Sequence, residues 1–423
     1  FWLKTVFSQM ASASMTHDGK TVVHFGSCSR PDLAQPLWEH VLARDPALWI
    51  WAGDAIYADE FDHMELFPWP EMKFKAGNIS HIQHLYNKQQ SVEGYAQLLQ
   101  SSTAVIGTWD DHDFGVNDAD RSYAYREESK QKFLDFIGEP ASSSRRNQEG
   151  LYAAHHYDFP GGGSILVVLL DVRYNRDPYG TDGGDFLGEE QWQWLTRVLS
   201  ESTARVHLIV SSLQVMQGRQ GLGENWVRFP EARERLLRLL TSRDLRAPIL
   251  LSGDVHMGEF SAATCSGGRL LEVTSSGMTH SWGTRLPQSS DQVLAGGMSF
   301  LMQMAQTLLP WRYQIRDAAG IPQYFLGLNF GELAFDWAQQ QVSISIVDDV
   351  GKPVLQLNTG LTALDMHGSE GASGCVPERG EPAEWRFVAG FTSCACILFS
   401  PVFVLRMLCI ATCRRRARKP HAE

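Results

Sequence analysis

Short apolar runs recur along the first 350 residues, and most of them end in small or polar residues. Continuous apolar runs of this length are typical of strands that are buried on both faces. Between them, Glu189–Leu199 and Pro230–Leu240 carry apolar positions at helical spacing. Strands that alternate with helices predict an α/β fold. The predicted strands are Thr21–Phe25, Leu48–Ala52, Ala104–Trp109, Ile165–Leu170, Val206–Ser211 and Ile249–Ser252, followed by Leu270–Thr274, Tyr324–Asn329 and Val342–Val347.

The pattern changes after residue 360. Residues 361–386 contain many Gly, Ser, Pro and Glu, the composition of a flexible linker. Residues 387–413 are mostly apolar, and the 19 residues before Arg406 are just long enough to cross a bilayer core of roughly 30 Å at about 1.5 Å per residue. We therefore expect a C-terminal transmembrane helix at 387–413, with a buried helix as the alternative.

The charge after this apolar segment predicts an orientation. Residues 414–423 form a basic tail, which is typical of the cytoplasmic side of a membrane. We expect a single-pass protein whose domain at residues 21–360 lies on the lumenal or extracellular side. Residues 1–20 are interpreted as an N-terminal segment whose natural start is missing, since the chain begins with Phe1.

The overall charge of the chain argues against nucleic acids as partners and favours cations. The 423 residues carry a net charge of −11, and the 18 residues from Arg406 onward contribute six basic and one acidic side chains. The rest of the chain therefore carries about −16, so we expect no nucleic-acid binding. An acidic protein that handles phosphate esters needs cations to offset its own field.

The seven cysteines are scattered and odd in number. This arrangement favours thiols, metal ligands or lipidation sites over a disulfide framework. Cys409 and Cys413 lie beside the basic tail, where palmitoylation is one interpretation.

Polar residues follow four of the predicted strands. The loops are Gly26–Ser29, Gly53–Asp59, Trp109–Asp113 and Ser252–His256. Because ligands bind at the carboxyl ends of strands in an open α/β sheet, we expect these loops to converge there. Carboxylate, imidazole, thiolate and phenolate groups are ligands for hard or borderline cations. The sequence therefore predicts a site for two or more metal ions.

These loops carry a family resemblance. Gly-Asp-x-x-Tyr at Gly53–Tyr57 and Gly-Asp-x-His at Gly253–His256 resemble the calcineurin-like metallophosphoesterases. Gly-Ser-Cys-Ser at Gly26–Ser29 and Trp-Asp-Asp-His-Asp at Trp109–Asp113 resemble the PhoD-like alkaline phosphatase D family within them. The resemblance spans roughly residues 20–350 and implies an α/β sandwich of two β-sheets flanked by helices.

The resemblance also implies a set of metal ligands. Asp54 is expected to bridge two ions, with Fe³⁺ and Ca²⁺ as the implied metals. The first ion, expected to be Fe³⁺, is held by Cys28, Asp54, Tyr57 and His256, and the second, expected to be Ca²⁺, by Asp54, Asp111 and Asp254.

Two further residues receive catalytic roles beside Asp111. His112 is expected to protonate the leaving alkoxide or to contact phosphate, and Arg173 is a candidate phosphate ligand. Their structural alternatives are a supporting role for His112 and a surface salt bridge for Arg173. The chain also departs from the family pattern, because Asp113 stands where members carry Glu. No His lies in Val210–Gln214, where Gln214 is a candidate oxygen ligand.

The function implied is hydrolysis of a phosphate ester by a metal-bound hydroxide in a membrane-anchored enzyme. Phosphomonoesters and phosphodiesters both remain open as substrates. Two alternatives are a metal-binding membrane protein that has lost catalysis and a phosphodiesterase that acts on phospholipids.

Overall fold

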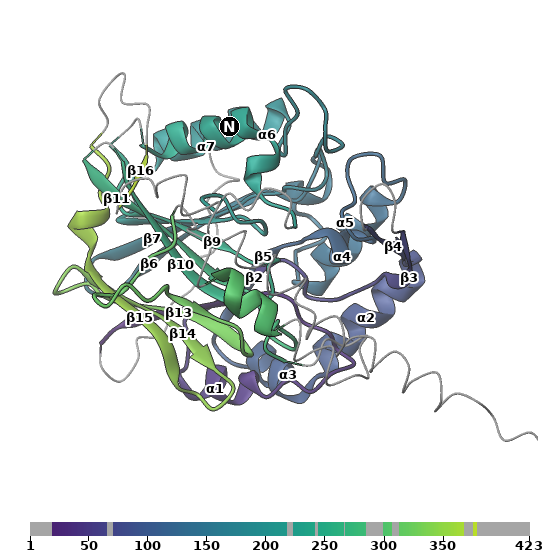
Figure 1. Cartoon of the computed structure of the whole chain (residues 1–423), viewed down its shortest axis with the longest axis horizontal. Helices are drawn as coiled ribbons and strands as arrows, with labels where there is room; N and C mark the ends of the chain where they lie inside the picture. The colour runs from purple at the N-terminus through teal and green to yellow at the C-terminus, as the bar shows by residue number, and fades with distance from the viewer. Residues whose placement is uncertain are drawn as a thin grey trace, which may run out of the picture.

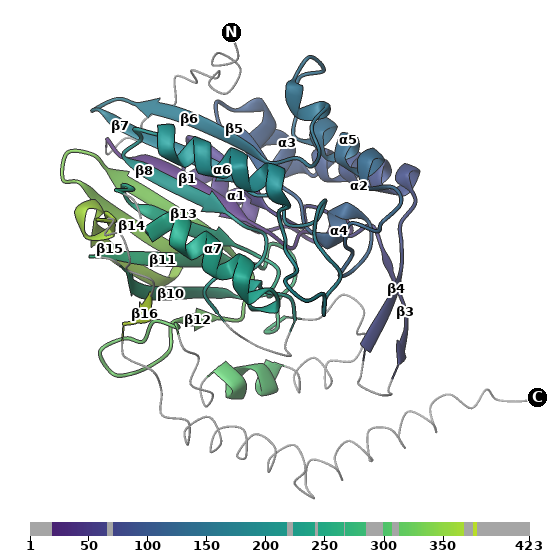
Figure 2. The same cartoon turned by 90° about the horizontal axis from the view of Figure 1, so that it is seen from above.

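Two β-sheets pack face to face, and helices cover the outer face of each (Figures 1 and 2). This structure is a computed structural model. It describes residues 19–65, 71–217, 223–241, 244–265, 267–284, 299–306, 313–367 and 375–378. The α/β fold with two sheets predicted from the sequence is confirmed.

The first sheet has the strand order β15-β14-β13-β1-β2-β5. Its parallel half consists of β1 (Thr21–Gly26), β2 (Leu48–Ala52) and β5 (Ala104–Thr108). Its antiparallel half consists of β13 (Asn329–Asp336), β14 (Gln341–Asp348) and β15 (Pro353–Gly360).

The second sheet has the order β12-β10-β11-β9-β8-β7-β6. Its parallel strands are β7 (Gly163–Leu169), β8 (Val206–Val210), β9 (Pro248–Ser252) and β11 (Gly268–Ser275). The antiparallel strands at its margins are β6 (Ala153–Phe159), β10 (Gly258–Cys265) and β12 (Tyr324–Phe325), with β16 (Val376–Pro377) beside β10.

Three apolar layers hold the sheets and helices together. One lies between the sheets, where the inward faces of β1, β7 and β9 meet. The helices that cover the first sheet are α1 (Leu37–Ala43), α2 (Ile79–Ser91), α3 (Glu93–Gln100), α4 (Asp111–Phe114) and α5 (Arg126–Phe136). Those that cover the second sheet are α6 (Glu189–Glu201) and α7 (Pro230–Thr241), and short 3₁₀ turns lie at η1 (Ser144–Arg146), η2 (Trp226–Arg228) and η3 (Leu361–Leu364).

The topology brings polar loops of both sheets to one edge. Cys28, Asp54, Asp110, Asp171 and Asp254 each lie two residues beyond the end of a parallel strand. Parallel strands end at the same edge of a sheet, and the two sheets pack with these edges side by side. The predicted convergence of the loops therefore follows from strand direction together with the packing of the two sheets.

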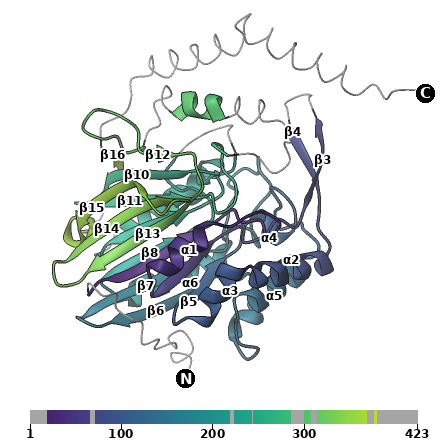
Figure 3. The same ribbon diagram turned by 90° about the horizontal axis from the view of Figure 1, so that it is seen from below.

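The two-stranded sheet of β3 (Glu60–Glu65) and β4 (Glu71–Lys75) was not predicted. It projects from the body of the molecule (Figure 3). The sequence of β3 mixes acidic, basic and apolar residues, so it has neither a continuous apolar run nor a clear alternation.

The interpretation of the cysteines is wrong at one pair. Cys265 at the end of β10 forms a disulfide with Cys375, across 110 residues. Val376 and Pro377 then pair with β10, and Glu378 forms an ion pair with Arg269. Part of the segment predicted as a linker at 361–386 is therefore attached to the second sheet.

Reduction of this disulfide is expected to lower the free energy of unfolding by about 2–4 kcal/mol, because a long covalent loop restricts the unfolded chain. Urea denaturation with and without reductant measures the loss. Cys375→Ser should match the reduced wild type and should not respond to reductant. Equal unfolding midpoints for oxidised and reduced wild type would contradict this expectation.

The terminal segments fall outside this description. Among the described residues, no helix combines the length and apolar character needed to cross a bilayer. The predicted transmembrane helix at 387–413, the basic tail at 414–423 and nearly all of the N-terminal segment at 1–20 lie outside the described residues.

Candidate active site

Four side chains predicted for the first metal ion meet at the shared edge of the sheets. Sγ of Cys28 lies 3.6 Å from Oδ2 of Asp54, and the Tyr57 hydroxyl lies 3.1 Å from the same oxygen. The Tyr57 hydroxyl is also 3.0 Å from Nε2 of His256, which belongs to the loop after β9. Loops after β1, β2 and β9 thus contribute to one cluster, in which Cys28 and Asp54 are buried and Tyr57 and His256 are half-buried.

The backbone at these residues is unusual. Cys28, Asp54, Asp254 and His256 have φ values of 60°, 49°, 67° and 53°, in the left-handed region that side chains other than Gly rarely adopt. They make up half of the eight non-glycine residues with positive φ in the described chain. Strained conformations of this kind concentrate at functional sites, where the surrounding structure enforces them.

Glycines allow the loops to approach closely. A Cβ atom on Gly253 would lie 2.8 Å from the carbonyl oxygen of Ala52 and 2.3 Å from Oγ of Ser27. A Cβ atom on Gly53 would lie 2.8 Å from the Cβ atoms of Asp110 and Ser212. The Gly-Asp dipeptides therefore set the spacing between the two sheets at the site.

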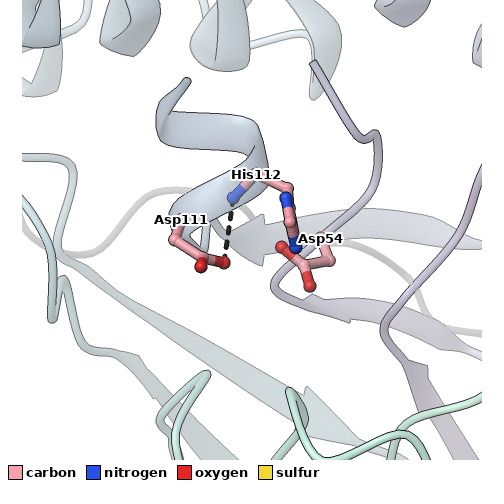
Figure 4. Close-up of side chains that lie close together, drawn as sticks. All are labelled: Asp54, Asp111 and His112. Carbon is pink, nitrogen blue, oxygen red and sulfur yellow. Dashed lines mark hydrogen bonds between the residues drawn. The ribbon is translucent and has the colours of Figure 1, made fainter. Parts of the chain in front are cut away.

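A second group of ligand atoms adjoins the first through Asp54. Ligand atoms of Asp54, Asp111 and His112 lie within 4.8 Å of one another, as do those of Asp110, Asp111 and Asp254. Figure 4 shows that the ring of His112 points toward Asp54, while its backbone N–H donates to Asp111. Asp54 and Asp111 thus connect side chains from both sheets.

The carboxylates of this site lack the positive charge that they need. Oδ1 of Asp54 and Oδ2 of Asp110 are buried without a hydrogen-bond partner among the described residues. Burial, followed by the charges of Cys28 and Asp111, raises the pKa of Asp54 well above its usual range. Burial and the charges of Asp110, Glu224 and Asp111 raise the pKa of Asp254 in the same way. Bound cations would satisfy these oxygens, so the donor set fits a metal centre.

The Cys28 thiol fits the same interpretation. Burial raises its pKa to about 12, although hydrogen bonds from Ser276 and Ser27 oppose this shift. A thiol with such a pKa is neutral at pH 7, and metal ligation is the ordinary route by which a buried thiol becomes a thiolate.

Arg173 is fully buried beneath the acidic residues. Its guanidinium binds the carboxylates of Asp110 and Glu224, and one of its nitrogens lies 3.9 Å from Asp111. These contacts favour a role in holding the acidic loops over a direct contact with phosphate. The surface salt bridge considered for Arg173 is wrong, since its partners are buried as well.

His112 is held from two sides. Its Nδ1 lies 2.6 Å from Oδ1 of Asp59, and its ring stacks on Tyr57 with centroids 4.0 Å apart. Burial lowers the pKa of His112, but the charges of Asp111 and Asp59 outweigh this effect and raise it to about 9. The contact with Asp59 occupies Nδ1 and leaves Nε2 to act on a substrate.

Asp113 and Gln214 have structural contacts. Asp113 accepts hydrogen bonds from the backbone N–H groups of Ala55 and Ile56 and from the Tyr86 hydroxyl. It thus ties the loop of Asp54 to that of Asp111. Gln214, the candidate oxygen ligand, directs its amide nitrogen to Glu259 and Thr274 in the second sheet.

The sequence assigned no role to Glu224 and Asp118, and it marked His280 only as a residue that could border the site. Nε2 of His280 lies 3.1 Å from the Tyr57 hydroxyl. Glu224 and Asp118 form a third acidic group with Asp111. The position of His280 after the strand Leu270–Thr274 was a usable signal, whereas Glu224 and Asp118 lie in irregular loops with no pattern to mark them.

Two packed sheets with acidic, imidazole and thiol groups at one shared edge define an α/β sandwich with a candidate multinuclear metal centre. Within that class, the chain belongs to the PhoD-like phosphatase family, whose family model matches residues 23–274. The matched region contains every predicted metal ligand and both His112 and Arg173.

One curated relative and two solved structures are similar to this chain. Alkaline phosphatase D of Bacillus subtilis (strain 168) is 26% identical over 218 residues, which are 43% of this chain and 36% of that protein. The match thus spans about a third of the length of this relative. A solved structure of PhoD superposes with a TM-score of 0.57 at 15% identity, over 92% of this chain and 80% of that one, and shows the fold. A purple acid phosphatase from yellow lupin (Lupinus luteus) seeds gives a TM-score of 0.48 at 12% identity, over 83% and 55% of the two chains.

Proposed function

We propose that this protein is a calcineurin-like metallophosphoesterase that hydrolyses phosphate esters with two or more metal ions. The observation that carries the proposal is the position of Asp54. One of its carboxylate oxygens contacts Tyr57 and Cys28, and a ligand atom of the side chain lies within 4.8 Å of one of Asp111, which also forms a group with Asp254. A carboxylate shared by two ligand clusters is the arrangement that a pair of neighbouring cations requires.

The residues divide between two ions. Cys28, Asp54, Tyr57 and His256 would hold the first, for which thiolate and phenolate favour Fe³⁺, and Asp54, Asp111 and Asp254 would hold the second, for which the all-oxygen set favours Ca²⁺. When bound, such ions supply positive charge to the phosphate oxygens and lower the pKa of water.

The protein residues supply orientation and a proton. A bond forms between a water oxygen and phosphorus, while the bond between phosphorus and the alcohol oxygen breaks. His112 donates the proton on Nε2 to the departing alcohol oxygen, while the attacking water gives up one proton to the solvent, from which His112 is protonated again. Asp59 orients this imidazole through its 2.6 Å contact with Nδ1, and its charge helps to raise the pKa of His112. Arg173 holds Asp110, and with it the loop that carries Asp111.

Purified protein should release 4-nitrophenol from 4-nitrophenyl phosphate or its bis-ester, and the two rates decide between monoester and diester. Elemental analysis should find iron and calcium, and a tyrosinate–ferric centre should absorb visible light. Chelation should abolish turnover. Stoichiometric metal without turnover of either ester would instead support the metal-binding protein that has lost catalysis.

We also propose that residues 387–413 anchor the domain in a membrane from its lumenal or extracellular side. The apolar length and the basic residues that follow support this proposal. Deletion of residues 379–423 retains Cys375 and the Glu378–Arg269 ion pair. We expect the deletion to move the protein from the membrane to the aqueous fraction with its activity retained. Membrane recovery of the deleted form would contradict the anchor.

A further inference from the structure

A row of aromatic rings leads outward from the metal-ligand cluster. Tyr57 stacks on His112 with centroids 4.0 Å apart, and His112 meets Phe74 edge-on at 6.1 Å. Phe74 in turn meets Phe61 edge-on at 5.9 Å. Exposure rises along the row, from 8% for His112 through the half-buried Phe74 to 42% for Phe61. The row therefore connects the proposed proton donor to the surface.

The two phenylalanines belong to the projecting hairpin. Phe61 of β3 and Phe74 of β4 are direct cross-strand partners. The residue before β3 is Asp59, which contacts His112 through Oδ1 and accepts a hydrogen bond from the backbone N–H of Asn117 through Oδ2. The base of the hairpin is thus fixed to the same histidine that Phe74 touches, while its outer part extends from the body (Figures 2 and 3).

The position of the proton donor determines which part of a substrate comes next to these rings. An acid that protonates the leaving oxygen must lie within hydrogen-bond reach of that oxygen. The alcohol group of the ester therefore lies on the His112 side of the phosphate. Tyr57 stacks on one face of the His112 ring, and Phe74 and then Phe61 are the rings that lead from His112 toward the surface. An alcohol group of more than a few atoms that extends outward from His112 would therefore meet Phe74 and then Phe61.

We propose that Phe74 and Phe61 form a binding subsite for an apolar alcohol group of the ester. The proposal rests on the proposed phosphoesterase function and adds a substrate class, namely esters with an alkyl or aryl chain. A cross-strand aromatic pair also stabilises a hairpin, so a purely structural role is the rival explanation. Substrate selectivity separates the two, because hairpin stability alone does not distinguish short from long alcohols.

The test compares kcat/KM for octyl phosphate and ethyl phosphate on the full chain with its metals, below the concentration at which octyl phosphate forms micelles. Both leaving groups are primary alkoxides of similar basicity, so their chemical reactivity is alike. We expect a preference for the octyl ester. Phe61→Ala should reduce this preference about fivefold, the effect of losing about 40 Å² of apolar contact at about 25 cal/mol per Å².

Two variants complete the design. Phe61→Leu retains apolar area and should keep most of the preference. Leu99→Ala removes a side chain of similar exposure, 40%, from α3 and should leave the preference at the wild-type value.

Each outcome decides a separate point. Equal kcat/KM for the two esters in the wild type would overturn the subsite and leave the proposed function standing. A fall in both rates of Phe61→Ala with an unchanged preference would assign the pair to hairpin stability and also overturn the subsite. Failure of the wild type to hydrolyse any ester would instead reject the proposed function.

Discussion

Replacement of Asp54 by Asn is expected to reduce kcat/KM at least about a thousandfold and to remove bound metal from the protein. The substitution keeps the shape of the side chain but takes away the negative charge that both ligand groups share. Metal content by elemental analysis and turnover of 4-nitrophenyl esters should fall together.

The same change should not destabilise the metal-free protein. Burial and neighbouring charges hold the pKa of Asp54 well above its usual range, so a neutral amide removes an unfavourable charge. Thermal unfolding of the wild type and the variant, both after removal of metal by a chelator, compares their stabilities. The matched control is Asp158→Asn, at an exposed position of β6. We expect this variant to retain both metal and activity. Full activity in Asp54→Asn would refute the shared carboxylate.

Replacement of His112 by Asn is expected to reduce kcat by about 10²–10⁴-fold for an alkyl phosphate, because the alkoxide then leaves without a proton. The asparagine amide retains a donor for Asp59 and lacks the nitrogen at the Nε2 position. The loss should be much smaller for a 4-nitrophenyl ester, whose leaving anion needs no proton. Equal losses on both esters would show that His112 contacts phosphate and does not donate to the alcohol.

Asp59→Asn tests how His112 is tuned. The charge of Asp59 contributes to the raised pKa of His112, so its removal should lower that pKa. An acid is active below its pKa, so the alkaline limb of the kcat profile should move to lower pH. If the apparent pKa of the alkaline limb does not change, a group other than His112 titrates in that limb.

The sequence predicted the centre of the site because the strands that carry it are buried on both faces. Continuous apolar runs such as Leu48–Ala52 marked where each strand ends, and the metal-competent residues follow at once. Strand direction and the packing of the two sheets then placed Asp54 and Asp254 at one edge, where each forms a group of ligand atoms with Asp111, although 200 residues separate them in the chain.

The parts that the sequence did not predict depend on contacts without a local pattern. Glu224 lies in an irregular segment before η2, and only the folded chain brings it to Arg173. Cys265 and Cys375 become partners because β10 and β16 pair, and β16 is too short for a hydrophobic signal. The projecting hairpin has exposed faces, so its strands lack the apolar runs by which the others were found.

The left-handed backbone at Cys28, Asp54, Asp254 and His256 has a consequence for protein engineering. Each such residue costs on the order of 1–3 kcal/mol, and glycine or asparagine would relieve much of that cost. A library of variants selected for heat resistance alone would therefore enrich replacements at these four positions. The selected variants would gain thermal stability and lose catalytic activity. Thermostable variants of this protein need a turnover assay at every round of selection.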